Sequence, residues 1–139
     1  MNSPFVFAHK VRVDEVDAAG IVYFARYFQW CHEAMATMLE PLDGGYASLL
    51  NSRGEGLPTV HAEADYTAPL RFGDSVAIAV CVEKIGRSSC SLRFDLFRAS
   101  DHRPVATVRH VVALTDIGAM QSRPLPADVR SIFERYATA

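Results

Sequence analysis

The 139-residue sequence has no excess of positive charge, no long apolar run and no paired cysteine spacing. Its formal net charge is −2, so we expect no surface that binds nucleic acid or an anionic membrane through a basic patch. Charged residues interrupt the apolar stretches every few positions, which predicts no transmembrane helix. Half of the residues are hydrophobic and 22% are charged, a composition typical of a globular protein.

Cysteine and histidine are too sparsely placed to suggest a metal or a disulfide. The sequence has an odd number of cysteines, Cys31, Cys81 and Cys90, and none of them forms a C-x-x-C motif. We therefore expect reduced, mostly buried thiols. The five histidines show no H-E-x-x-H spacing, and no G-K-S/T follows the glycines as a phosphate loop requires. No signal peptide is recognisable before residue 10, so a cytoplasmic protein without a metal or cofactor is expected.

Two hydrophobic periodicities predict the secondary structure. A stripe at helical spacing predicts one long, heavily buried helix ending at Pro41; its members are Phe24, Tyr27, Phe28, Cys31, Met35, Met38 and Leu39. Alternation with a period of two predicts five strands, over residues 5–13, 57–67, 75–84, 89–98 and 105–116. A short final helix is expected to begin near Pro126 and Asp128. The glycine-rich segment 43–56 is expected to be a loop or lid around a short helix at 46–51.

The order of these elements predicts the fold class. One very apolar helix against a five-stranded, mostly antiparallel sheet is an α+β arrangement. No internal repeat, low-complexity tract or linker interrupts the chain. We therefore expect a single domain over residues 1–139.

The segment 17–24 combines a carboxylate with the start of the predicted helix. Asp17 is followed by small residues, and Gly20 permits a tight turn. A helix N-terminus offers unpaired N–H groups and the positive end of the helix dipole. A backbone amide there would polarise a thioester carbonyl while Asp17 attacks its carbon or activates water. The alternative is that Asp17 only caps the helix, as aspartate often does.

Two stretches carry a resemblance to a known family. Residues 17–27, D-A-A-G-I-V-Y-F-A-R-Y, resemble the signature of the 4-hydroxybenzoyl-CoA thioesterase family. Residues 57–74, L-P-T-V-H-A-E-A-D-Y-T-A-P-L-R-F-G-D, resemble its second strand and the P-x-x-x-G-D turn that follows. The resemblance extends over nearly the whole chain. F-Q-W-C-H-E-A at 28–34 and V-H-A at 60–62 look closest to the 1,4-dihydroxy-2-naphthoyl-CoA hydrolases of this family.

The resemblance implies a hotdog fold and hydrolysis of an acyl-CoA thioester. It implies homodimers that pair through the second strand, often assembled into homotetramers, with active sites at the dimer interface. Asp17 matches the catalytic carboxylate, acting as nucleophile through a mixed anhydride or as general base on water. Phe24 matches the residue whose backbone N–H points at the thioester oxygen. Gly20 and Tyr23 of the same motif are candidates for substrate contact.

His61 is a further candidate on the polar side of the predicted second strand. The resemblance implies that this strand lies near Asp17 of the partner subunit. His61 would there bind substrate hydroxyls or the attacking water. The alternative is a solvated or interface histidine.

The phosphates of CoA need cations, and the family often supplies them from a basic turn before the fourth strand. In the corresponding turn, residues 84–89, Arg87 stands beside Ser88, but its other neighbours are glycine and serine. Arg87 and Ser88 are therefore candidates, and Arg71 or Lys84 shares the task. Arginine suits phosphate geometry, yet exposed arginines are commonly only solvated.

Other polar residues are assigned structural roles. We expect Asp14 and Glu15 to be solvated loop residues. Cys31 and His32 cannot form a nucleophile–base pair, because neighbouring residues of a helix point about 100° apart. Cys31 is expected in the core, and His32 is expected to be packed and hydrogen-bonded. His110 is expected to be a satisfied core residue.

Three functions remain open: thioester hydrolysis, dehydratase or hydratase chemistry on an acyl thioester, and acyl-CoA binding without catalysis. The histidine expected of hotdog dehydratases is absent around Asp17. An aromatic acyl-CoA is favoured by the resemblance, and a short- or medium-chain aliphatic one is the alternative. The aromatic residues of the predicted helix would suit an aryl group or be ordinary core; they are Tyr23, Phe24, Tyr27, Phe28 and Trp30.

Overall fold

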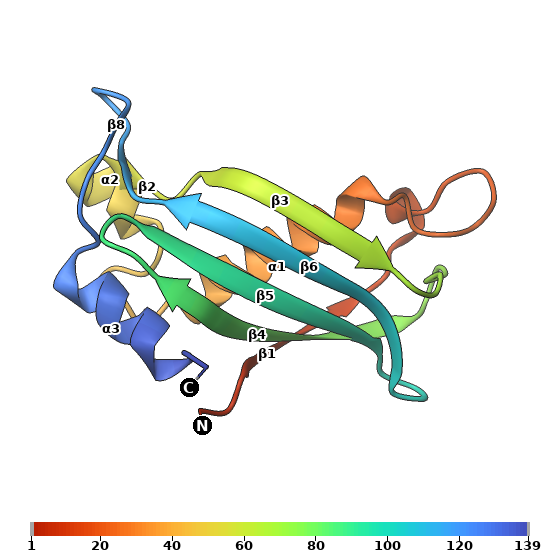
Figure 1. Cartoon of the computed structure of the whole chain (residues 1–139). Helices are drawn as coiled ribbons and strands as arrows, with labels where there is room; N and C mark the ends of the chain where they lie inside the picture. The colour runs from red at the N-terminus through yellow and green to blue at the C-terminus, as the bar shows by residue number, and fades with distance from the viewer. Residues whose placement is uncertain (1, 139) are drawn as a thin grey trace.

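A five-stranded antiparallel sheet curves around one long helix in the computed structural model, which describes residues 2–138 (Figure 1). The strands are β1 Phe5–Lys10, β2 Glu55–Gly56, β3 Thr59–Tyr66, β4 Ser75–Ile85, β5 Ser89–Arg98, β6 Arg103–Ala113, β7 Thr115–Asp116 and β8 Gln121–Ser122. The helices are α1 Ala25–Met38, α2 Ser48–Arg53 and α3 Ala127–Arg135, with a 3₁₀ turn η1 at Val13–Glu15. The main sheet has the order β1-β4-β5-β6-β3. The expected α+β architecture is confirmed.

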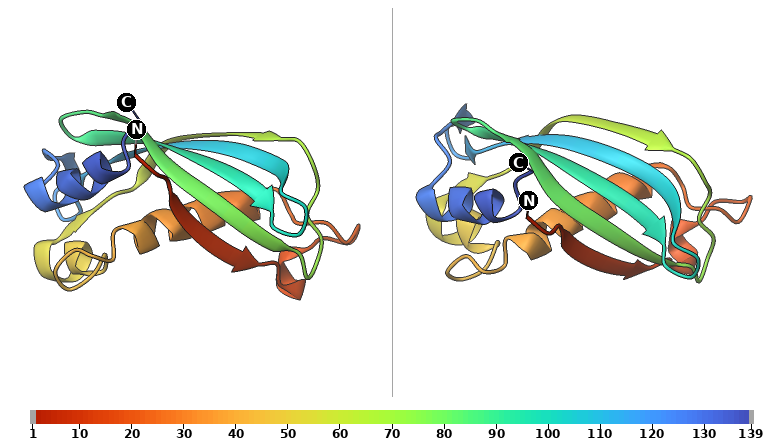
Figure 2. Two further views of the ribbon diagram at one scale, coloured as in Figure 1. Left: turned by 90° about the horizontal axis from the view of Figure 1, so that it is seen from below. Right: turned by 60° about the horizontal axis from the view of Figure 1, so that its bottom comes forward.

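Helix α1 provides much of the core, because the sheet curves over it along its whole length (Figure 2). Its buried residues are Tyr27, Trp30, Cys31, Ala34, Met35 and Met38. Trp30 is not a member of the predicted stripe, yet it is only 1% exposed. Phe24, predicted to begin that stripe, is 56% exposed because it precedes the first helical residue, Ala25. The buried face is therefore rotated toward Trp30.

Strand β3, like β1 on the opposite side, is an edge of the main sheet. It pairs only with β6, and none of its eight residues is buried. Thr59 pairs with Val112 and His61 with Val111, so Val60 is an extra residue in a β-bulge. A period of two places Val60 and Ala62 on the same side of the strand, but the bulge breaks this relation, and Val60 is 63% exposed. A long edge strand with unpaired backbone groups and exposed apolar side chains is suited to pairing with another chain.

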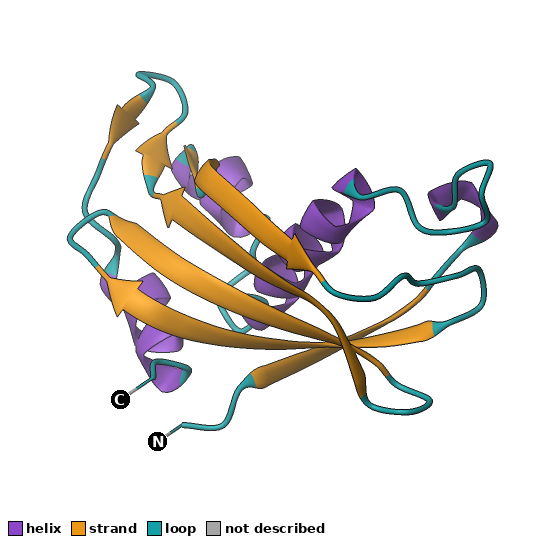
Figure 3. Ribbon diagram, turned by 45° about the vertical axis from the view of Figure 1, so that its right-hand side comes forward, coloured by secondary structure: helices purple, strands orange, loops and turns teal. Residues whose placement is uncertain are grey.

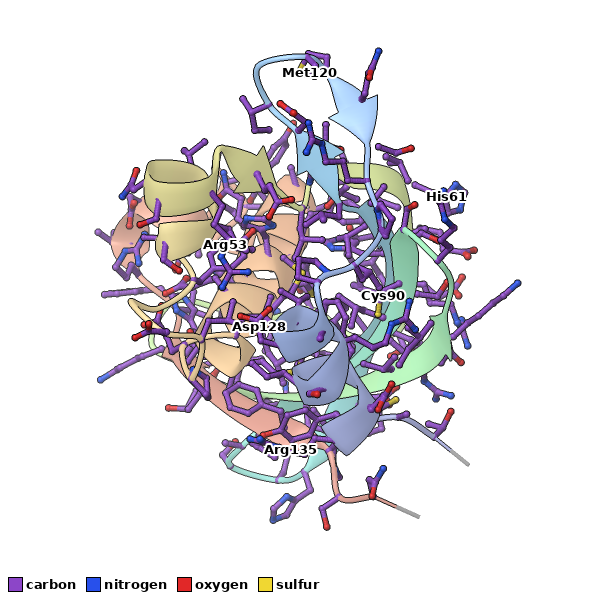
Figure 4. All side chains as sticks on the ribbon, turned by 90° about the vertical axis from the view of Figure 1, so that its left-hand side faces the viewer. Arg53, His61, Cys90, Met120, Asp128 and Arg135 are labelled. Atoms are coloured by element: carbon purple, nitrogen blue, oxygen red, sulfur yellow. The ribbon has the colours of Figure 1, made fainter. Side chains whose placement is uncertain are left out.

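Helices α2 and α3 gather at one end of the sheet (Figures 1 and 2). The Arg53 guanidinium donates to both Asp128 oxygens, at 3.2 and 2.6 Å, and joins the two helices (Figure 4). Leu49 of α2 is 1% exposed, so this part of the predicted lid packs into the core. The predicted strand 105–116 is interrupted at Leu114, and its last residues form β7 in a small β2-β7-β8 sheet (Figure 3). The sequence patterns did not predict this sheet.

The three cysteines are free thiols, as expected. Cys31 and Cys90 are fully buried, and burial raises the pKa of the Cys90 thiol to about 12. Neither thiol is therefore suited to act as a nucleophile. Across residues 2–138, no helix is both long and apolar enough to cross a membrane. Nor do three or more His, Cys, Asp or Glu side chains in this range gather as metal ligands would.

Candidate active site

Asp17 opens a tight turn between η1 and α1. Its N–H donates to the Ile21 carbonyl at 2.8 Å, and its carbonyl accepts the Gly20 N–H at 2.9 Å. Gly20 has φ +81°, a left-handed conformation that favours glycine. The Asp17 Oδ1 atom accepts the Ala19 N–H at 2.9 Å and the Ile21 N–H at 3.4 Å. One carboxylate oxygen thus organises the turn from within.

Asp17 does not cap α1. The helix begins at Ala25, and its N-cap residue is Phe24, which makes no side-chain capping bond. The interpretation of Asp17 as a helix cap is therefore wrong. The Asp17 side chain is exposed in the isolated chain, and it lines none of the three cavities described below. A complete site around Asp17 would need a second surface.

Glu15 is buried beneath this turn, so its predicted role as a solvated loop residue is wrong. The side chain is 2% exposed and accepts three hydrogen bonds, from Trp30 Nε1 at 2.6 Å, Arg12 N–H at 2.8 Å and His9 Nε2 at 2.8 Å. Burial alone would raise the Glu15 pKa, but these donors outweigh it and lower the pKa. The Glu15 carbonyl also accepts the Tyr23 N–H at 3.0 Å. Glu15 therefore fixes both ends of the Asp17 turn.

Asp14 behaves as expected. It is exposed and forms a 3.1 Å ion pair with Arg12 Nε, which lowers the Asp14 pKa through a side-chain hydrogen bond. Two neighbouring acidic residues thus differ completely in environment. The aromatic partner on α1 makes the difference, because only Glu15 reaches Trp30.

The start of α1 is joined to the last residue of β3. The Tyr66 hydroxyl donates to the Phe24 carbonyl at 2.9 Å. Among residues 2–138, the Phe24 N–H has no backbone acceptor. A cavity of about 360 Å³ lies at this junction, lined by Ile21, Val22, Phe24, Tyr27, Tyr66, Thr67, Ala68 and Pro69. The Asp17 turn therefore lies beside the C-terminal end of the edge strand.

A mostly apolar groove of about 460 Å³ lies at the other half of β3. Its lining residues are Phe28, Gln29 and His32 of α1, Thr59 and Ala62 of β3, and His110 of β6. A second cavity of about 490 Å³ shares His32 and continues toward α2. His32 is exposed at the boundary of the two cavities, so the prediction of a packed residue is wrong. Both volumes are within the usual range for small-molecule sites.

His110 is buried as predicted, but it is not satisfied. Its side chain is 3% exposed, and no protein group among residues 2–138 hydrogen-bonds its Nε2 atom. Its ring stacks on Phe28 with a centroid distance of 5.7 Å and meets Phe94 edge-on at 5.2 Å. Burial and the neighbouring His32 lower the His110 pKa to about 4, so its ring is neutral at pH 7. The groove thus has a neutral imidazole in its wall.

Some candidate residues lie together in one chain. Asp17, Gly20, Tyr23 and Phe24 share one loop. Arg71 lies beside that loop, because it forms a β-bridge with Ile21.

The other candidate residues lie apart from this loop. His61 projects from the outer edge of β3 and is 62% exposed, with Nε2 3.8 Å from Glu63 Oε1 (Figure 4). Arg87 and Ser88 occupy the β4–β5 turn, and the Arg87 carbonyl accepts the Leu125 N–H at 2.9 Å. That turn lies at the opposite end of β4 from Arg71 (Figure 1).

Sequence and structure comparisons define the family. Residues 11–133 match the model of the thioesterase-like superfamily, and the chain belongs to that family. It is therefore a thioester hydrolase with the hotdog fold that the resemblance implied. The 1,4-dihydroxy-2-naphthoyl-CoA hydrolase of Synechococcus elongatus is 35% identical over 123 residues, which cover 88% of this chain and 89% of the relative.

Two solved structures agree with this assignment. A 1,4-dihydroxy-2-naphthoyl-CoA thioesterase from Synechocystis superposes with a TM-score of 0.83 at 25% identity, covering 93% of this chain and 94% of that one. A gentisyl-coenzyme A thioesterase superposes with a TM-score of 0.81 at 29% identity, covering 92% of this chain and 98% of that one.

Proposed function

We propose that this protein hydrolyses an aromatic acyl-CoA to the free acid and CoA, with Asp17 as the reacting carboxylate. The observation that carries the proposal is the loop that holds Asp17 and the Phe24 amide, fixed from below by Glu15. The relatives support an aromatic acyl group, because their names give dihydroxynaphthoyl-CoA and gentisyl-CoA as substrates. The groove along α1 also supports it, because Phe28 and His110 offer flat rings to an aryl group.

The proposed active unit is a dimer paired through β3. A two-fold axis between two antiparallel β3 edges brings the C-terminal end of one strand opposite the N-terminal end of the other. The Asp17 loop lies beside Tyr66 at the C-terminal end, and the groove begins at Thr59 at the N-terminal end. Such a dimer places each groove next to Asp17 of the partner subunit. This arrangement accounts for an Asp17 that lines no cavity in one chain.

The chemistry follows from this arrangement. The thioester carbonyl accepts the free N–H of Phe24 at the positive end of α1, which stabilises the oxyanion as it forms. In one route Asp17 attacks the carbonyl carbon, CoA leaves as thiolate, and water hydrolyses the mixed anhydride. In the other route Asp17 takes a proton from the water that attacks. His61 binds a substrate hydroxyl or this water from the edge of the other subunit.

The CoA phosphates are assigned to exposed cations at the rim. Arg71 is beside the Asp17 loop of its own chain, whereas Arg87 and Ser88 lie at the far end of β4. The two-fold pairing brings the β4–β5 turn of one subunit, which carries Arg87 and Ser88, toward the Asp17 loop of the other subunit. Arg71 and Arg87 from different subunits are therefore the proposed phosphate ligands, with Ser88 beside them.

A thiol-release assay with a panel of acyl-CoAs tests this function. The panel contains hydroxybenzoyl-, naphthoyl-, short-chain and long-chain acyl-CoAs. The proposal predicts the highest kcat/KM for the aryl thioesters. Preference for an aliphatic chain contradicts the substrate class, and tight acyl-CoA binding without thiol release contradicts catalysis.

A further inference from the structure

Within residues 2–138, His110 Nε2 is a buried side-chain atom without a hydrogen-bond partner, and the proposed chemistry does not use it. His110 stands on β6 between Ala62 of β3 and Leu92 of β5 in the pairing register. The same face of β6 is otherwise apolar, with Val108 and Val112 fully buried on either side. An apolar residue would satisfy packing at this position. A buried imidazole without a protein partner costs free energy there, since an unpaired buried polar group has lost its hydrogen bonds to water.

The position of His110 joins this unpaired group to a cavity. The ring is part of the wall of the groove, and Phe28 stacks on it from α1. Ala62, its neighbour across the sheet, has a small side chain that leaves room in the groove. The rest of the lining is apolar except at the rim, where Gln29, His32 and Thr59 stand. A ligand in this groove thus meets one buried hydrogen-bonding group.

We propose that the groove is a specificity subsite in which His110 hydrogen-bonds a hydroxyl on the aromatic ring of the acyl group. This inference rests on the proposed function, because it assumes that the aryl group enters this groove. A neutral imidazole can accept a hydrogen bond from a phenolic O–H or donate one to its oxygen, depending on the tautomer. A site with a buried polar partner selects strongly for the substrate that completes the hydrogen bond. The subsite therefore selects hydroxylated aryl thioesters over their unsubstituted counterparts.

The test compares substrates that differ by one hydroxyl. The kcat/KM of benzoyl-CoA is measured beside those of its 2-, 3- and 4-hydroxy isomers, with wild type and His110→Leu. For wild type we expect the kcat/KM of at least one hydroxy isomer to exceed that of benzoyl-CoA by about tenfold to a hundredfold, which corresponds to the free energy of one buried hydrogen bond. In His110→Leu that ratio should fall to about one, because leucine cannot form the bond.

Two further variants separate recognition from packing. His110→Gln retains a donor and an acceptor at this position and should retain most of the preference. Val108→Ala removes buried volume from the same face of β6 without lining the groove, so it should leave the ratio unchanged. A drop in the ratio with Val108→Ala as large as that with His110→Leu would overturn the inference.

The failure of the inference is distinct from failure of the proposed function. If wild type hydrolyses aryl-CoAs but His110→Leu keeps the wild-type ratio, the subsite is wrong and the function stands. If wild type hydrolyses no aryl-CoA, both are wrong.

Discussion

The indole N–H of Trp30 donates a 2.6 Å hydrogen bond to the Glu15 carboxylate, and this contact joins the central helix to the turn that holds Asp17. Both partners are almost completely buried. Charge-assisted hydrogen bonds of this length are stronger than neutral ones. Because the Glu15 carbonyl also holds the Tyr23 N–H, the carboxylate and the backbone of one residue fix the Asp17 loop.

Removing the Glu15 carboxylate should destabilise the protein markedly. Glu15→Ala leaves the Trp30 indole N–H, the Arg12 amide and His9 without their acceptor, and we expect a loss of about 3 kcal/mol. Asp14→Ala is the matched control. Because Asp14 is exposed, this substitution should lower the free energy of unfolding by less than about 0.5 kcal/mol. Urea denaturation at pH 7.5 measures both variants. Equal stabilities of the two variants would show that the buried network contributes nothing.

Stability should decrease as the pH falls below neutrality, in part because of His110. Its pKa is about 4 when folded and about 6.5 when unfolded, so between these values only the unfolded chain binds the proton. This difference in proton binding lowers the free energy of unfolding by about 2 kcal/mol between pH 7.5 and pH 5. His110→Leu should lack this part of the pH dependence, whereas Val108→Ala should retain it. Urea denaturation at the two pH values measures the free energy of unfolding of each variant. If His110→Leu loses as much stability between pH 7.5 and pH 5 as wild type, the contribution of His110 is refuted.

The free edge of β3 should be the dimer interface. A charge at Val60 would be desolvated between two paired edges, so Val60→Lys should shift the protein toward the monomer. Leu50→Lys changes a similarly exposed apolar residue on α2 and should leave the assembly unaltered. Light scattering with size-exclusion chromatography reports the mass, which for a dimer is twice 15.3 kDa. A monomeric wild type at micromolar concentration would contradict the paired-edge arrangement.

Binding of the CoA phosphates should depend on Arg87. Arg87→Ala should raise KM for an acyl-CoA about two- to fivefold, a range typical of exposed ion pairs. The acyl-pantetheine analogue lacks the nucleotide phosphates, so its KM should not respond. Arg93→Ala is the control, because Arg93 lies in the middle of β5, paired with Asp95 and away from both ends of the sheet. Equal effects on both substrates would assign Arg87 a structural role.

Much of the fold was predictable from hydrophobic periodicity. The strand predicted over residues 89–98 coincides with β5, and the stripe ending before Pro41 located α1 correctly. Alternation reports which side of a strand is apolar, and it holds along most of β5, which is paired on both edges. It fails at Val60, where a bulge inserts one residue into an edge strand.

The site was less predictable, because its polar groups are defined by contacts distant in sequence. Asp17 and Phe24 stand out locally as a motif on one loop. Glu15 does not, because its burial depends on Trp30, fifteen residues further along the chain. His110 lies on an apolar face, and nothing in its neighbours reveals that no partner reaches its Nε2 atom.

The most direct test of the account is the rate of thiol release by Asp17→Asn from the best aryl-CoA. Asparagine retains an oxygen to accept the Ala19 N–H, so the turn is preserved while the carboxylate is lost. We predict a fall in kcat of about a hundredfold or more, with substrate binding retained and Asp14→Asn unchanged. A kcat of Asp17→Asn within threefold of wild type would contradict the assignment of Asp17 as the reacting group.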